Sequence, residues 1–304
     1  MTTITLLHPG AMGAPFASWA VANGHTVLWV SEGRSPATRD RADKAGLTER
    51  PDLAGALGES EVVLSVCPPH AAEDVARSVA EHGYTGLYVE ANAISPARLD
   101  AIGSLLGPSA VLDGAIIGPP PADGKEARLY LAGAEEHQEL ARDIFEGTAV
   151  KVRDAGPRVG AASALKMAFG GYQKAARMLA AVAHALADDH GVGDLLAEEA
   201  RTMPAAILAD RGYIPSVAAR AWRWAPEMRE VAETLEAAHL PAHLAHAAAE
   251  TMRLWDADKD RTDLTPSEAP TPPGPVQLQK PPADSLADTL PTSTLELPPP
   301  PSHP

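Results

Sequence analysis

A short turn near the start of the chain combines residues that can hold a phosphate through their backbone. The apolar run TITLLH at 3–8 leads into Pro9-Gly10-Ala11-Met12-Gly13, and the helix-like segment APFASWAVANG follows. The spacing matches the dinucleotide-binding pattern G-x-G-x-x-G, with His8 at the first glycine position. This position tolerates a side chain if the turn relaxes, whereas the second and third positions keep their glycines.

The two retained glycines have distinct roles in such a turn. The second, Gly10, lets the backbone approach a pyrophosphate, and the third, Gly13, lets strand and helix pack closely. The helix N-terminus then offers N–H groups and a favourable dipole to the phosphates. We therefore predict a cofactor-binding turn rather than a purely structural one. Its members are His8, Gly10, Ala11, Met12 and Gly13.

The residues after the second apolar run, HTVLWV at 25–30, indicate which nicotinamide cofactor is bound. An NAD site needs a carboxylate here, but the position falls on Ser31. Arg34 and Ser35 follow, and a guanidinium with hydroxyl donors suits a 2′-phosphate. Glu32 argues for NADH, because a shift of one residue would bring an acid to the ribose. We predict NADPH in preference to NADH, bound by Ser31, Arg34 and Ser35.

The eleven histidines raise the question of a metal site. In AHLPAHLAHAAAE, His239, His243 and His246 have spacings that a helix would align. Pro241 interrupts the first pair, and neither an acidic residue nor a cysteine completes a zinc-binding pattern. We therefore predict no metal site.

Short apolar runs and helix-like segments alternate in the first half of the chain and must position these residues. Strands separated by helices predict right-handed βαβ units and a parallel sheet covered on both faces. The predicted strands are at 3–8, 25–30, 61–66 and 86–91, with two more between about 110 and 133. The predicted helices between them are at 14–24, 35–46 and 70–83.

The second half of the chain is helical in character. Residues 157–191 carry no strand signal and predict one long helix, in which Gly170-Gly171 marks a weak point or a close approach. Shorter helices follow through RWAPEMREVAETLEAAH and PAHLAHAAAETMRLW, and the helical region ends near Asp256. Trp222 and Trp224 are expected to be core or dimer-contact residues.

Composition excludes several classes of protein. The net charge of −15 over 304 residues argues against nucleic acid or an anionic membrane as partner. No apolar run reaches the ~18 residues of a membrane span, and no basic segment precedes a long apolar run as in a signal peptide. Cys67 is the only cysteine, so no internal disulfide forms. We expect a soluble cytoplasmic protein.

The last part of the chain differs in composition. From about residue 259 it is proline-rich, polar and almost free of aromatic residues, which predicts a disordered tail. A linker-like end is favoured over a polyproline ligand for a partner. The predicted divisions are 1–155, 156–258 and 259–304.

Five motifs in one order point to a family. HPGAMG, LSVCPP, YVEANAISP, VLDGAIIGPPP and GAASALKMAFGGYQKA follow one another as in the β-hydroxyacid dehydrogenases. That family includes 3-hydroxyisobutyrate and 6-phosphogluconate dehydrogenases, and imine reductases are close relatives. The chain resembles it over about residues 3–256. The doubled proline and RWAPEM look most like a branch whose C-terminal domain is phosphogluconate-dehydrogenase-like and of unknown function. The resemblance implies an α/β Rossmann N-terminal domain that binds NADP and an all-α C-terminal domain.

The resemblance also implies an acid/base lysine on the long helix. Lys166, six residues after Gly160, matches the family spacing. A lysine on an apolar helix facing a cleft has a lowered pKa and can exchange a proton with an alcohol or imine. The alternative is an ordinary lysine whose amine reaches solvent. Lys174 lies two turns further on the same face and could bind an anionic substrate group.

Further cofactor contacts carry over from the CPP and ANAISP motifs. By position, Cys67, Pro68, Asn92 and Ala93 would surround the nicotinamide ribose. We do not expect Cys67 to be a nucleophile, because no base is recognisable beside it and a cysteine that ends a buried strand is usually core.

Three departures from the family concern the substrate. Ile117-Gly118-Pro119 stands where the family has the S-G-G turn that holds a carboxylate. Gly170 replaces an asparagine that orients the substrate, and Glu227 corresponds loosely to an acidic residue on a later helix. A serine replaced by isoleucine makes the pocket more apolar. A simple 2-methyl-3-hydroxypropanoate substrate is therefore not expected. The predicted substrate-binding residues are Ile117, Gly118, Pro119, Gly170, Lys174 and Glu227.

Together these features predict an NADPH-dependent oxidoreductase. Hydride would pass between the nicotinamide and a small carbonyl or hydroxyl substrate, with Lys166 as the acid/base, in a homodimer formed through the C-terminal helices. Imine reduction is the enzymatic alternative, although that branch usually has Asp or Tyr in place of the lysine. A non-catalytic NADPH-binding or partner-binding protein is the other alternative.

Overall fold

A computed structural model describes residues 1–264 except 108–110, 190, 203–210 and 238–241. The predicted disordered tail lies almost entirely outside the described residues. Its first residues are described, and Leu264 is buried against the helical core. The packed part of the chain therefore extends beyond residue 258.

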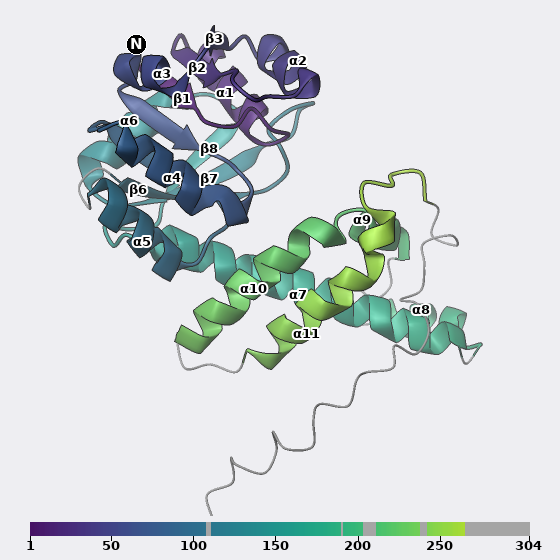
Figure 1. Ribbon diagram of the computed structural model, residues 1–304. Coiled ribbons are helices and arrows are strands. Elements are labelled where there is room, and N and C mark those ends of the chain that lie inside the picture. The colour runs from purple at the N-terminus through teal and green to yellow at the C-terminus, as the bar shows by residue number, and fades with distance from the viewer. Residues whose placement is uncertain (108–110, 190, 203–210, 238–241, 265–304) are drawn as a thin grey trace, which may run out of the picture. The chain divides into compact units, whose positions relative to one another are not determined.

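Eight strands of the described residues form one sheet in the order β3-β2-β1-β4-β5-β6-β7-β8 (Figure 1). Neighbouring strands pair in parallel, except that β6 and β7 are antiparallel. The prediction of a parallel sheet therefore holds up to β6. The strands are β1 (Thr3–Leu6), β2 (Thr26–Val30), β3 (Thr48–Arg50), β4 (Val62–Ser65), β5 (Leu87–Glu90), β6 (Val111–Ile117), β7 (Ala127–Ala132) and β8 (Val150–Asp154).

Helices cover both faces of this sheet. Alternate strand residues contribute to two apolar clusters, as expected for a sheet buried on both sides. One cluster includes residues of α1, α2 and α6, and the other includes residues of α3, α4 and α5. These helices are α1 (Gly13–Ala22), α2 (Pro36–Lys44), α3 (Leu53–Glu59), α4 (Ala72–Glu81), α5 (Pro96–Leu106) and α6 (Glu135–Ile144).

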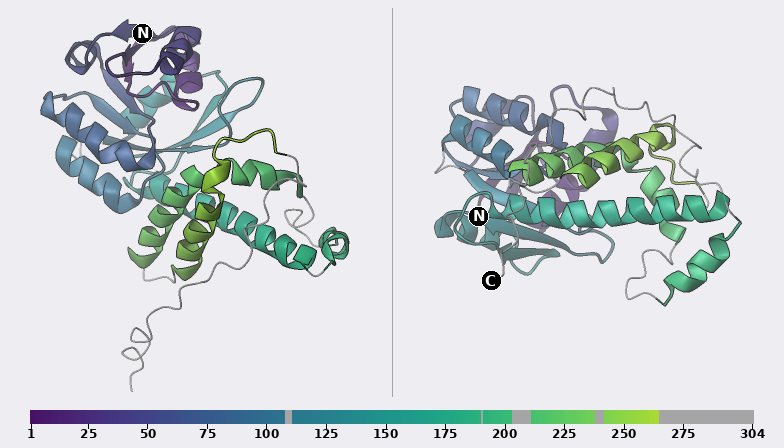
Figure 2. Two further views of the ribbon diagram at one scale, coloured as in Figure 1. Left: turned by 45° about the vertical axis from the view of Figure 1, so that its right-hand side comes forward. Right: turned by 90° about the horizontal axis from the view of Figure 1, so that it is seen from below.

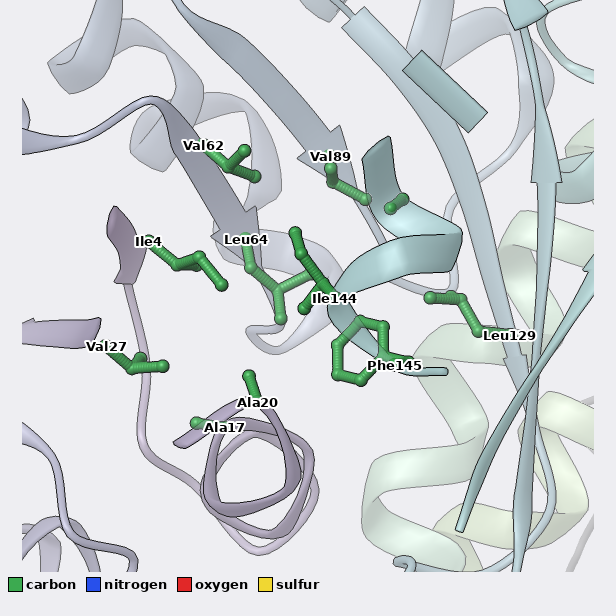
Figure 3. Close-up of a pocket in the computed structure, with 11 residues that line it drawn as sticks. Ile4, Ala17, Ala20, Val27, Val62, Leu64, Val89, Leu129, Ile144 and Phe145 are labelled. Carbon is green, nitrogen blue, oxygen red and sulfur yellow. The ribbon is translucent and has the colours of Figure 1, made fainter. Parts of the chain in front are cut away.

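The first of these clusters contains a small internal cavity, shown in Figure 3. Ala17 and Ala20 of α1 face the strands there, together with Ile144 at the end of α6 and the neighbouring Phe145. All of the lining residues are apolar, so the cavity is expected to be dry. It is a packing gap in the core and not a ligand site.

A second core lies in the helical half. The predicted long helix is α7 (Ala161–Asp189), and α10 (Ala221–Ala237) and α11 (His243–Met252) pack against it and against each other (Figure 2). Gly171 permits this packing, because a Cβ there would lie 2.8 Å from Cγ1 of Val231 on α10. The other elements are α8 (Gly193–Ala200), α9 (Ile214–Ala218) and the 3-10 helices η1 (Pro69–Ala71), η3 (Arg211–Tyr213) and η4 (Arg253–Asp258). None of the helices in the described ranges is long and apolar enough to cross a membrane.

Asp113 of β6 joins the sheet to the long helix. Its carboxylate accepts hydrogen bonds from N–H groups at the start of α7, at 2.9 Å from Gly160 and 2.9 Å from Ala162. It also accepts bonds from the N–H and the hydroxyl of Ser163, the latter at 2.6 Å. The buried carboxylate therefore accepts hydrogen bonds from the free N–H groups of the helix N-terminus, and its negative charge interacts favourably with the helix dipole. This cap fixes where Lys166, one turn further, meets the sheet.

Candidate active site

Most of the predicted cofactor-binding residues lie at the carboxyl ends of the strands. The strand order runs β1-β2-β3 in one direction and β4-β5-β6 in the other, so the order reverses between β1 and β4. In an open α/β sheet this reversal marks the crevice where ligands bind. The His8–Gly13 turn follows β1, Ser31 follows β2, Cys67 follows β4 and Asn92 follows β5.

The turn after β1 has the geometry that its glycines predict. A Cβ on Gly13 would lie 2.3 Å from the carbonyl oxygen of His8, so a side chain there does not fit. A Cβ on Gly10 would meet nothing within 4 Å. The turn is thus closed on its strand side and open at Gly10, as close backbone approach to a pyrophosphate requires. These residues fit a dinucleotide.

His8 is neutral in this turn. Burial, followed by the nearby charge of Arg34, lowers the pKa of His8 to about 4. Its buried Nδ1 has no hydrogen-bond partner among the described residues. At neutral pH His8 therefore contributes no positive charge to phosphate binding, and its ring nitrogen is left for a ligand atom.

Arg34 lies beside this turn. Its Nη2 donates to the carbonyl of Leu7, at 3.2 Å, and its buried Nε has no partner in the described part of the chain. Ser35 instead caps α2, because its hydroxyl accepts a hydrogen bond from the N–H of Thr38 at 3.3 Å. Of the three predicted 2′-phosphate ligands, Arg34 has the strongest free donor, and Ser31 is largely buried.

Arg41 is a neighbour of the turn that the sequence did not single out. Its Nε donates to the carbonyl of Pro9, at 3.0 Å, and its Nη2 to the hydroxyl of Thr38. It therefore fixes α2 against the turn. Arg41 lies in the last turn of α2 (Pro36–Lys44), one of several basic residues after β2, and nothing in the local sequence pattern singled it out.

Asn92 links the ends of β4 and β5. Its side-chain amide donates to the hydroxyl of Ser65 at 2.9 Å, and its carbonyl oxygen accepts the N–H of Cys67. The structure thus brings the predicted Cys67 and Asn92 together. Burial, and secondarily the charge of Glu90, raises the pKa of the Cys67 thiol to about 12. The thiol is therefore protonated at neutral pH.

Glu90 lies fully buried beneath this network. One carboxylate oxygen accepts the N–H of Asn92, and Oε2 has no partner in the described ranges. Burial raises the pKa of Glu90 to about 8, above its ordinary value in the unfolded chain. Its stabilising contribution is therefore complete below about pH 4.5 and is lost as the pH rises through about 8.

This linkage predicts a pH-dependent effect of Glu90→Gln. The free energy of unfolding of the native protein should fall between about pH 5 and 8, by up to ~1.4 kcal/mol per pH unit from this group. Glu90→Gln should remove that fall and be the more stable form at pH 8. Urea unfolding of both proteins across this range measures it, with exposed Glu139→Gln as the control. If the free energies of unfolding of Glu90→Gln and the native protein changed in parallel with pH, ionisation of Glu90 would not destabilise the fold.

Lys166 reaches from α7 to the end of β6. Its Nζ donates to the carbonyl of Ile116 at 2.9 Å, directly before the Ile117-Gly118-Pro119 segment. Burial is the main cause that lowers the pKa of Lys166, Lys174 lowers it further, and Glu227 raises it. The structure therefore places the predicted lysine and the predicted substrate turn together.

Lys174 and Glu227 also converge on this place. Lys174 Nζ lies 2.7 Å from Glu227 Oε1, and the same oxygen lies 3.9 Å from Lys166 Nζ. The predicted role of Lys174 in binding an anionic group thus meets a competitor, since its ammonium already has a carboxylate partner. Gly170 lies beneath the pair. A Cβ there would be 3.4 Å from both charged atoms.

The predicted substrate turn is apolar where it faces the core. Ile117 is buried, whereas Gly118 and Pro119 are exposed. Gly118 has φ +129°, and a Cβ there would lie 3.1 Å from the carbonyl oxygen of Glu126. The chain therefore offers an aliphatic side chain and an exposed backbone at this position, without the serine hydroxyl of the resembled family.

Glu230 is a second acid on α10 that the sequence analysis missed. It accepts hydrogen bonds from the N–H of Ser95, at 3.1 Å, and from the guanidinium of Arg98, which also pairs with Glu73. Ser95 caps α5 and lies two residues after the Asn92-Ala93 segment. The pair Glu227 and Glu230, three residues apart on α10, was the available signal.

The histidine cluster is only partly described. His239 lies outside the described residues, His243 begins α11 and is exposed, and His246 Nε2 lies 2.9 Å from Glu236 Oε1. Trp224 packs against the helical core and under the Lys174 ammonium, 5.8 Å from the ring centroid. Trp222 is more exposed and lies beneath Lys259.

Comparison with known protein families gives a match in the C-terminal part of the chain. A domain family of unknown function, DUF1932, matches residues 187–255. A protein of Methanothermus fervidus, described as an uncharacterized 28.5 kDa protein in the 7S RNA 5′ region, is 28% identical over 167 residues. The match covers 55% of this chain and 64% of that protein, so the chain matches just under two thirds of its length.

Solved structures share the whole fold. One, a conserved protein of unknown function described as structurally similar to 3-hydroxyacid dehydrogenases, has 25% identity and a TM-score of 0.64, covering 84% of this chain and 98% of that one. The Mycobacterium tuberculosis 3-hydroxyisobutyrate dehydrogenase with L-serine has 21% identity and a TM-score of 0.70, covering 88% and 98%. An imine reductase variant from Myxococcus stipitatus, in complex with NAD⁺, has 18% identity and a TM-score of 0.51, covering 83% and 93%.

These findings confirm the resemblance drawn from the sequence. The structural neighbours include a 3-hydroxyisobutyrate dehydrogenase and an imine reductase, and the DUF1932 match falls on the C-terminal helices. The Rossmann-like N-terminal region followed by a helical region is likewise confirmed.

Proposed function

We propose that this chain is a nicotinamide-dependent oxidoreductase that acts on a small carbonyl or hydroxyl substrate, with Lys166 as the acid/base. The observation that carries the proposal is the position of Lys166. Its amine lies on the carbonyl of Ile116 at the carboxyl end of β6, and the nucleotide-binding turn lies at the same edge of the sheet. The fold shared with dehydrogenases and imine reductases supports it.

The cofactor would be held by the strand ends. The open backbone at Gly10 and the N-terminus of α1 suit the pyrophosphate, and Arg34 suits a 2′-phosphate. Cys67 and Asn92 at the ends of β4 and β5 would lie towards the nicotinamide end. A bound nicotinamide supplies or accepts the hydride.

Lys166 would manage the proton in this reaction. An ammonium has three donors, and one is used on Ile116, so two remain for a substrate oxygen or nitrogen. Its lowered pKa brings proton exchange closer to neutral pH, where an acid/base group is most effective. In reduction it would donate a proton to the new alkoxide, and in oxidation it would accept one.

The proposed preference for NADPH rests on Arg34. Arg34→Ala should weaken NADPH binding by about 10- to 100-fold, because a charge-assisted contact to the 2′-phosphate is lost, and should change NADH binding little. Fluorescence titration with each cofactor measures the effect. Arg50→Ala is a matched control. It removes another arginine, one on β3 whose guanidinium pairs with Glu59 of α3. Equal losses for both cofactors would remove the 2′-phosphate assignment.

Turnover decides between the enzymatic proposals. The full chain with NADPH would be screened against aldehydes, ketones, hydroxy acids and cyclic imines, with cofactor absorbance as the readout. Reduction of carbonyl compounds supports the main proposal. Imine reduction is the second candidate. The buried Ile117 stands where the resembled hydroxyacid dehydrogenases have a carboxylate-binding serine, so the site is less suited to a hydroxy acid. Tight cofactor binding without any turnover would point to a non-catalytic nucleotide-binding protein.

We also propose a homodimer through the C-terminal helices. Leu165, Phe169 and Tyr172 form an apolar stripe along α7, and Tyr172 is 73% exposed. Such a stripe is usually covered by a partner. Sedimentation analysis of the native chain should give twice the chain mass, and Tyr172→Glu should shift it towards monomer. A monomeric native chain would contradict the proposal.

A further inference from the structure

Two buried charges from different helices meet over the middle of α7. Lys174 is 7% exposed and Glu227 9% exposed, and their charged atoms are 2.7 Å apart. The Lys174 ammonium also lies over the Trp224 ring. A buried pair of this kind is held firmly, because removing either partner leaves an uncompensated charge away from water.

The two adjacent glycines of α7 make room for this pair. A Cβ on Gly170 would lie 3.4 Å from both Lys174 Nζ and Glu227 Oε1, and a Cβ on Gly171 would lie 2.8 Å from Val231. Helix interiors disfavour glycine, so two in succession have a cost in stability. Their effect is to let α10 approach α7 until Glu227 reaches both lysines.

Glu227 is shared unequally between the lysines. Its Oε1 makes a close contact with Lys174 and lies 3.9 Å from Lys166. Lys166 instead hydrogen-bonds the carbonyl of Ile116. The carboxylate is therefore near enough to act electrostatically on Lys166, while its tight partner is Lys174.

From this arrangement we propose that Lys174 is a positioning residue that clamps the Glu227 carboxylate, so that Glu227 tunes the proton exchange of Lys166 without closing a tight ion pair on it. The inference rests on the proposed function only in taking Lys166 as the acid/base. Without the clamp, Glu227 would be free to turn fully onto Lys166 and occupy the amine that a substrate needs.

The position of α10 supports the clamp at a second point. Glu230, three residues after Glu227, is bonded to Ser95 and Arg98 at the start of α5. The charged groups that act on Lys166 are thus Glu227 from α10 and Lys174 from α7 itself. Arg223, one turn before Glu227 on α10, is another charged group within electrostatic range of that carboxylate. From β6 the contact is the uncharged carbonyl of Ile116.

The clamp predicts opposite effects from its two halves. Lys174 lowers the pKa of Lys166 and Glu227 raises it. Lys174→Met should therefore raise the pKa of Lys166, both by removing a like charge and by freeing Glu227 to approach. Glu227→Gln should lower it. A charge within about 4–6 Å moves a pKa by roughly 1–3 pH units, so both changes are measurable.

The test is an NMR titration of the native full-length chain with ¹³C-labelled lysine and no cofactor or substrate. The Lys166 signal is assigned by its loss in Lys166→Met. Lys174→Arg keeps the charge and should leave the Lys166 titration close to native. The matched control is Lys151→Met, which removes a lysine of β8 that pairs with Glu126 and not with Glu227. The double variant Lys174→Met/Glu227→Gln removes both charges and should titrate between the two single variants.

Opposite shifts in the two single variants, with an intermediate double variant, support the clamp. Shifts in the same direction, or native titration in both, overturn it. If Glu227→Gln does not fold because Lys174 is left unpaired, the comparison of Lys174→Met with the double variant decides, and equal titration in those two overturns the clamp. The readout needs no turnover, so it judges the clamp separately from the proposed oxidoreductase activity. Where turnover is found, the pH profile of kcat/KM should move with the NMR value.

Discussion

Lys166→Met is expected to lower kcat/KM by about 10²- to 10⁴-fold while the affinity for NADPH stays near native. A positioned acid/base group contributes about this much to a rate, and methionine keeps the length of the side chain without its proton. The predicted cofactor-binding turn follows β1, whereas the side chain of Lys166 contacts Ile116 and Glu227. Steady-state rates and fluorescence titration together measure the two effects.

The change should not act through unfolding. The lost hydrogen bond to Ile116 is worth about 1 kcal/mol, and removing a largely buried amine offsets part of that cost. Thermal melting checks this, with Lys151→Met as a control that removes a partly exposed, ion-paired lysine on β8. Native turnover in a folded Lys166→Met protein would remove this lysine from the mechanism and would turn attention to the remaining groups of the site.

Alanine at the two glycines of the first turn should have contrasting effects. Gly13→Ala places a methyl group 2.3 Å from the carbonyl oxygen of His8, so the turn must move. We expect a loss of about 1–3 kcal/mol in the free energy of unfolding, together with loss of cofactor binding. Gly10→Ala meets nothing within 4 Å and should melt at or near the native temperature.

Gly10→Ala should nevertheless weaken NADPH and NADH alike, by about tenfold or more, which corresponds to ~1.4 kcal/mol. The new methyl group would lie where the backbone approaches the pyrophosphate. Melting curves and cofactor titrations of the two variants form a matched pair, since each adds the same methyl group to the same turn. Native cofactor affinity in Gly10→Ala would show that the pyrophosphate does not lie on this turn.

The glycine results would also bear on His8. The turn forms with histidine at the first position, and its carbonyl is the atom that Gly13 must accommodate. The histidine side chain is neutral and only partly exposed, so in the proposed complex the backbone donors of α1 would hold the phosphates. Of the three glycine positions of the motif, the first is therefore the one at which this chain tolerates another residue.

Most of the strands and helices could be predicted from local pattern. The apolar runs that became β1, β2, β4 and β5 are short, buried on both faces and bounded by turn residues, which is why periodicity and composition identified them. The long helix α7 was equally clear. The strands β3 and β8 were missed because TER and VKVRD are short, polar edge strands whose pairing comes from their neighbours.

Three of the helices against the sheet were also missed, although one carried a signal. In α5 the Ser95-Pro96 start is a standard cap with proline in the first turn. The helix α3 (LAGALGE) is only seven residues long and contains two glycines, and α6 (EEHQELARDI) has few apolar residues. All three cover the sheet, so their helical state is favoured by burial against it as much as by their own sequence.

The sequence by itself determined the residue types of the candidate site and the elements that carry them. The glycine turn, the strand-end residues, Lys166 and its two-turn neighbour Lys174 are all set by local spacing, because a helix or a turn fixes neighbours a few residues apart. Only the tertiary structure decided that Lys174 pairs with Glu227, 53 positions later in the chain, and that Glu230 reaches Ser95 and Arg98. Such contacts depend on how closely two helices pack. Between α7 and α10 that distance is set by the absence of a side chain at Gly171.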